Sequence, residues 1–80
     1  MSRTPKPFAV FGFESTHEAL AAERVLKDAG LQVVPIPAPA SLGTHCGIAL
    51  RVRESSSEQA LFELRAHDIE PSGIILMDDI

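Results

Sequence analysis

The sequence predicts an α+β fold in which two helices cover one face of a four-stranded antiparallel sheet. Three observations support this fold: four short apolar segments, two helical stretches that separate the first pair and the last pair of them, and a Ser-x-x-Glu sequence at the start of each helical stretch. The resulting order is βαββαβ. Because β-α-β crossovers are right-handed, two interlocked units form the ferredoxin-like two-layer sandwich.

Each expected element has a local signal in the sequence. The elements are strands over residues 8–13, 31–36, 48–53 and 73–77 and helices over 15–29 and 56–67. Aromatic and β-branched residues predict the strands, and apolar residues at helical spacing predict the helices. Both helices begin with a capping box, Ser15 with Glu18 and Ser55 with Glu58, and Gly30 is expected to end the first helix.

Prolines indicate which strand lies at an edge of the sheet. Pro35 falls within the second expected strand, and it has no main-chain N–H to donate. This strand therefore belongs at an edge, and Pro37 and Pro39 begin the loop that follows it.

Length and composition indicate a small globular protein. The 80 residues predict a single domain over 1–80, in which residues 1–7 are expected to be a disordered arm. The net charge of −4 argues against a nucleic-acid partner, as does the lack of aromatic residues over 47–53, where RNA-recognition domains carry them. No segment resembles a membrane span or a signal peptide, so we expect a cytoplasmic protein.

Cys46 is the sole cysteine, so an internal disulfide and a multi-cysteine zinc site are both excluded. The three histidines have no metal-binding spacing, and neither a metal nor another cofactor is expected.

The predicted topology places Cys46 near the start of the first helix. The first and third strands are antiparallel neighbours, so residues 15–17 and Cys46 meet at one edge of the sheet. Cys46 shares the parity of Ile48, which is expected to face the helices. Free amides at the helix start stabilise a thiolate, so the pKa of Cys46 is expected to fall below the usual value.

The candidate site consists of Cys46 with Ser15, Thr16, His17 and Gly47. His17 could add positive charge or accept a proton, and Gly47 would allow a ligand to approach the main chain closely. His45 is a weaker candidate, because its neighbouring position on a strand directs it to the opposite face.

Less specific interpretations stay open at this point. Cys46 could be a small buried hydrophobic residue, and helix capping alone explains Ser15. The site could also bind a small anion in a regulatory module without covalent chemistry. A Cys46–His17 enzyme dyad is a third interpretation, but no oxyanion-hole or pocket signature supports it.

Three segments resemble the selenium/sulfur (Se/S) carrier protein-like family: FESTHEALAAE over 13–23, the prolines at 35, 37 and 39, and CGIALR over 46–51. The resemblance extends over residues 11–77. It implies that Cys46 carries the chalcogen as a persulfide or selenopersulfide in surroundings formed by Ser15, Thr16 and His17. It also implies donor and acceptor proteins as partners, and a carrier rather than a stand-alone enzyme.

The sheet face opposite the helices is a further candidate for partner binding. By parity, the third strand places Gly47, Ala49, Arg51 and Arg53 on this open face, next to apolar residues of the other strands. A contiguous apolar patch suggests a partner surface, so we expect a second copy or a partner protein to cover this face.

Overall fold

The structure is a computed structural model that describes residues 7–42 and 47–77. Within these residues the chain follows the order βαββαβ, with a 3₁₀ turn before the third strand and another before the second helix. The strands are β1 (Phe8–Gly12), β2 (Val34–Pro37), β3 (Ile48–Arg53) and β4 (Gly73–Met77); the helices are α1 (Thr16–Asp28) and α2 (Ser57–Ala66); the 3₁₀ turns are η1 (Ala40–Leu42) and η2 (Glu54–Ser56).

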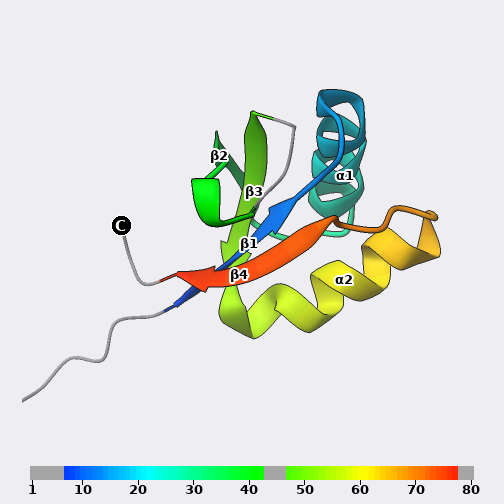
Figure 1. Ribbon diagram of the computed structural model, residues 1–80. Helices are drawn as coiled ribbons and strands as arrows, with labels where there is room; N and C mark the ends of the chain where they lie inside the picture. Colours follow the sequence, from blue (N-terminus) through cyan, green and yellow to red (C-terminus); the bar gives the residue numbers. More distant parts are fainter. Residues whose placement is uncertain (1–6, 43–46, 78–80) are drawn as a thin grey trace, which may run out of the picture.

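The sheet has β3 and β1 at its centre and β2 and β4 at its edges, in the order β2-β3-β1-β4. All neighbouring strands are antiparallel. At one end of the sheet, Gly12 of β1 lies opposite Ala49 of β3 and Gly73 of β4. Both helices lie on the same side of the sheet (Figure 1). The expected α+β ferredoxin-like sandwich is confirmed.

Helix α1 begins as its capping box predicts. Ser15 has extended backbone angles, φ −144° and ψ 158°, and its hydroxyl accepts a hydrogen bond from the main-chain N–H of Glu18 at 3.1 Å. Three residues on one face of the helix are buried, Ala19, Ala22 and Leu26. Their spacing of three and four residues gives α1 the apolar stripe that packs on the sheet.

Helix α2 begins differently, and the capping box expected at Ser55 and Glu58 is wrong. The chain first makes the turn η2, and the N-cap residue Ser56 makes no side-chain capping bond. The hydroxyl of Ser57 instead donates to the carbonyl of Glu54 at 2.8 Å. A tight 3₁₀ turn therefore leads into α2 in place of a side-chain cap.

Both helices end in a Schellman motif, in which one residue has a left-handed backbone conformation. That residue is Gly30 after α1, with φ +85°, and Asp68 after α2, with φ +61°. The next amide in each motif bonds the carbonyl five residues back, Leu31 to Leu26 at 3.1 Å and Ile69 to Leu64 at 2.8 Å. Gly30 thus ends α1 as expected.

Strand β2 begins three residues later than the expected strand over 31–36 and ends one residue later, at Pro37, which pairs with Ile48 and does not begin the loop as expected. The amide of Leu31 is engaged at the end of α1, and Val33 is buried in the core under the helices. Pairing with β3 therefore begins at Val34, opposite Arg51. The prediction that the proline-containing strand is an edge strand is confirmed.

The main core lies between the sheet and the helices. The sheet supplies Ala9, Phe11, Leu50 and Val52, and the helices supply Ala19, Ala22, Leu26, Ala60 and Leu64. Phe13, which was expected in the first strand, directly follows β1 and is also part of this core. Phe11 and Phe13 are among the largest fully buried side chains. The structure thus resolves which alternate residues of β1 face the helices, a choice that the sequence pattern left open.

The opposite face of the sheet is partly covered by the chain's own η1. Leu42 is buried against Val10 and Ala49, and a Cβ atom added to Gly73 would lie 3.2 Å from the carbonyl oxygen of Leu42. The predicted parity of Ala49 and Arg51 is confirmed, but η1 reduces the apolar surface of this open face. Self-association through it stays a prediction.

Pro7, which was expected in the disordered arm, is hydrogen-bonded to the chain at the end of β3. The carbonyl of Pro7 accepts a hydrogen bond from the main-chain N–H of Glu54 at 3.2 Å. Residues 1–6 of the expected arm lie outside the described residues.

Among the residues that the structure describes, neither helix is both long and apolar enough to cross a membrane.

Candidate functional site

The sheet register brings the start of β3 to the same edge as the N-terminus of α1. Gly12 ends β1 opposite Ala49, the second residue of β3, and α1 begins at Thr16. Figure 1 shows the start of β3 and the first turn of α1 at the same end of the molecule. The structure therefore confirms the backbone arrangement on which the candidate site depends.

The first turn of α1 is open to solvent. Ser15, Thr16 and His17 are all exposed. Ser15 accepts the Glu18 amide, so this hydroxyl has a capping role in addition to any role toward a ligand. The positive end of the helix dipole is directed toward this turn, which favours an anion here.

Gly47 marks where the chain enters β3. Its carbonyl accepts a hydrogen bond from the amide of Ala38 at 3.1 Å, and the residue is exposed. A Cβ atom added to Gly47 would meet no atom of the described residues within 4 Å. Packing against the described residues therefore does not require glycine at this position.

Cys46 lies outside the described residues, as do residues 43–45, which include His45. The orientation and the pKa of the Cys46 thiol thus stay predictions. The alternation on which the orientation depends holds for the described part of β3, because Leu50 and Val52 are buried under the helices and Ile48 packs against the same core.

Two carboxylates near this helix start were missing from the sequence-based site. Glu14 and Glu18 are exposed and flank residues 15–17 in the chain. Their negative charge opposes an anion at the N-terminus of α1, so it counteracts the helix dipole. Because both carboxylates lie close to Ser15 in the sequence, they could have been predicted as part of the candidate site.

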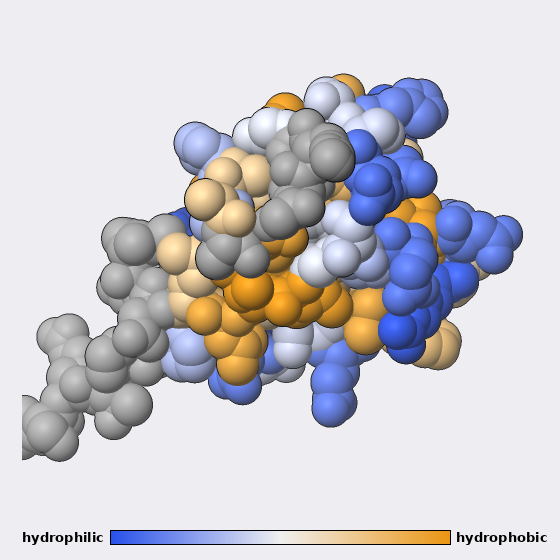
Figure 2. Space-filling view, in the orientation of Figure 1, coloured by the Kyte–Doolittle hydropathy of each residue, from blue (hydrophilic) through white to orange (hydrophobic). Residues whose placement is uncertain are grey.

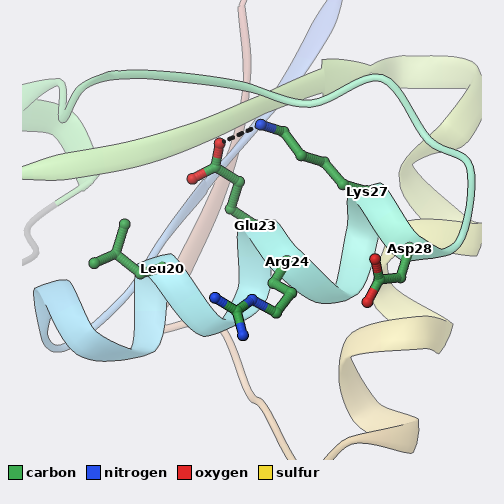
Figure 3. Close-up of a pocket in the computed structure, with 5 residues that line it drawn as sticks. All are labelled: Leu20, Glu23, Arg24, Lys27 and Asp28. Atoms are coloured by element: carbon green, nitrogen blue, oxygen red, sulfur yellow. Dashed lines mark ion pairs between the residues drawn. The ribbon is translucent and has the colours of Figure 1, made fainter.

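A shallow hollow on α1 lies away from this edge. It is lined by Leu20, Glu23, Arg24, Lys27 and Asp28, which all belong to one helix (Figure 3). Glu23 and Lys27 form an ion pair of 2.8 Å beside it. Among the described residues, no site residue lines the hollow, and no element other than α1 contributes to its lining. The hollow is therefore not part of the candidate site.

A metal centre is not indicated within residues 7–42 and 47–77, where no three metal-ligating side chains lie together. His67, at the end of α2, has its Nδ1 atom 3.0 Å from the carbonyl oxygen of Glu63. His17 lies at the start of α1. The two described histidines thus belong to different parts of the fold.

Comparison with protein families gives one match that extends over most of the chain. The family model described as "Putative Se/S carrier protein-like" matches residues 8–76. A search of curated proteins found no match, and a search of solved structures found none either. The matched range includes β1, the start of α1 and Cys46.

Proposed function

Because the chain belongs to the Se/S carrier protein-like family, we propose that it carries sulfur or selenium on Cys46 and delivers it to a partner protein. The observation that supports this most directly is the position of Gly47, which leads into β3 at the same edge as the first turn of α1. A nucleophilic sulfur next to Gly47 would face helix amides that favour its charged form.

The proposed transfer exchanges one sulfur–sulfur bond for another. The Cys46 thiolate attacks the outer sulfur of a persulfide on a donor protein, the donor's sulfur–sulfur bond breaks, and the donor leaves as a thiolate. An acceptor thiolate then attacks the outer sulfur on Cys46. This sulfur passes to the acceptor, and Cys46 is released as a thiolate. Neither step needs an external oxidant or reductant. A thioselenol donor would deliver selenium in the same way.

The rest of the chain suits a carrier in two respects. No second cysteine exists in the sequence to attack the inner sulfur of a loaded Cys46, form an internal disulfide and expel the outer sulfur as sulfide. Gly47 is exposed and none of the described residues lies within 4 Å of an added Cβ atom there, which is consistent with the approach of a donor or acceptor. A reducing cytoplasmic setting, where a lone thiol stays free, belongs to the same proposal.

Ser15, Thr16 and His17 form the proposed surroundings of the loaded sulfur. The amides of this turn supply positive potential, and the His17 ring is exposed at the same turn. Glu14 and Glu18 limit that potential, which keeps the thiolate from being so stabilised that it loses its nucleophilicity.

Intact mass spectrometry tests the proposal. The protein is purified without reductant, or incubated with a persulfide donor, and compared with the Cys46→Ser variant. We expect a mass increase of one sulfur or one selenium atom that reductant removes and that the variant lacks. A chain that gains no such mass from any persulfide or thioselenol donor would contradict the proposal and favour a non-covalent anion-binding module.

A further inference from the structure

The two edges of the sheet differ in their capacity to pair with another strand. β2 contains Pro35 and Pro37, which have no main-chain N–H to donate. β4 has the sequence Gly-Ile-Ile-Leu-Met, without proline or charge, and pairs with β1 on one side. In the described sheet, β4 is therefore the edge that can accept a further strand.

Apolar side chains of β4 also extend beyond the cover of the helices. Leu76 and Ile74 are 61% and 45% exposed. They lie opposite Ala9 and Phe11 of β1, which are buried beneath the helices. Figure 2 shows apolar side chains gathered over β4 in this view of the molecule. The helical layer thus stops short of the β4 edge.

We propose that β4 pairs with β4 of a second copy, antiparallel and about a two-fold axis at Ile75, so that the two sheets join into one. The paired segment is self-complementary. The axis places Ile74 opposite the second copy's Leu76 on the helix side, and no charged residue falls within the five positions.

The proline-containing edge explains why the occupant is one second copy and not a growing chain of copies. A contact between β4 and another copy's β2 would repeat without closing and form a filament. Pro35 and Pro37 remove the donors that such a contact needs. Pairing of β4 with β4 uses both open edges, so the assembly closes at two copies.

The area of the interface sets the strength of the dimer. Each copy contributes two partly exposed apolar side chains, Ile74 and Leu76, which is far less than the roughly 800 Å² per partner of a standard stable interface. The main-chain hydrogen bonds of the paired strands add to this contact. The dimer is therefore weak and forms at high protein concentration.

Sedimentation velocity over a concentration series, from about 10 µM to about 1 mM, tests the interface. Reductant is present throughout, so that a disulfide between two Cys46 residues cannot produce a dimer. We expect a monomer–dimer equilibrium whose dissociation constant rises at least about tenfold in Leu76→Lys. The matched control is Val34→Lys, because Val34 is a 42% exposed strand residue on the other face and the other edge.

A charge pair tests the position of the axis. In the double variant Ile74→Glu/Leu76→Lys, each new carboxylate lies opposite the second copy's new ammonium group, so we expect dimerisation to recover relative to Leu76→Lys. A strict monomer in the wild type, growth into higher oligomers, or loss of the dimer in Val34→Lys alone would overturn the proposal. If dimerisation does not recover in the double variant, the two-fold axis does not lie at Ile75. Circular dichroism shows that each variant is folded.

Discussion

The guanidinium carbon of Arg51 lies 4.4 Å from the centroid of the Phe8 ring, on the sheet face opposite the helices. The strand register places Arg53 directly opposite Phe8, whereas Arg51 is opposite Val10. The Arg51 side chain therefore reaches diagonally across the strands to the ring. Its buried Nε atom has no hydrogen-bond partner among the described residues, and the ring face supplies a favourable contact to the charged group.

A double-mutant cycle measures this contact. We expect Phe8→Leu and Arg51→Met to show a coupling free energy of about 1 kcal/mol in urea unfolding, because a cation above an aromatic ring is attracted by its electron-rich face. The matched cycle of Phe8→Leu with Arg53→Met should give less than about 0.5 kcal/mol. Equal couplings in the two cycles would show that the ring makes no specific contact with Arg51.

The two helix starts predict different responses to the loss of a serine. Ser15→Ala removes the acceptor of the Glu18 amide, so the free energy of unfolding should fall by about 1 kcal/mol. Ser56→Ala removes no capping bond and should change it by less than about 0.5 kcal/mol. Thermal or urea unfolding of the two variants side by side checks this difference, and a similar loss in both would refute it.

The two helix ends predict changes of opposite sign. Asp68 holds the left-handed conformation that Gly30 holds after α1, and its negative charge lies at a helix C-terminus. We expect Asp68→Gly to raise the free energy of unfolding by about 0.5 kcal/mol, since it removes backbone strain and an unfavourable charge. Gly30→Ala should lower it by about 1 kcal/mol through strain, because no atom of the described residues lies within 4 Å of the added Cβ. Changes of the same sign in urea unfolding would contradict this reasoning.

The charges near α1 predict how the reactivity of Cys46 responds to substitution. We expect the pKa of the Cys46 thiol to lie below that of a free cysteine, measured as the pH dependence of alkylation by iodoacetamide, because helix amides favour the thiolate. Glu14→Gln with Glu18→Gln should lower this pKa further, most clearly at low salt, because two opposing charges are removed. A wild-type pKa at or above the free value would exclude the stabilised thiolate.

Gly47 offers a variant that separates folding from transfer. An added methyl group meets no described atom within 4 Å, and Gly47 does not have a left-handed φ. We therefore expect Gly47→Ala to change the free energy of unfolding by less than about 0.5 kcal/mol. If partners approach the main chain at this point, sulfur transfer to an acceptor thiol should slow in the same variant. A large loss of stability would show instead that glycine serves the fold here.

Local signals in the sequence determined the elements and their order. The Ser15 cap, the glycine at residue 30 and the alternation over 48–53 each depend on residues a few positions apart, so they could be recognised without the fold. Together with the βαββαβ order, these signals also predicted that the residues after β1 lie at the edge of the sheet at which β3 begins. The position of Cys46 relative to α1 is predicted from the same signals.

Tertiary contacts decided what those signals could not. The alternate residues of β1 are apolar on both faces, so packing against the helices selected Phe11 for the main core and left Val10 to be covered by Leu42. The exposure of Leu76 depends on how far the helical layer extends over the sheet. Each of these depends on residues distant in the chain, and their contacts form only when the layers pack.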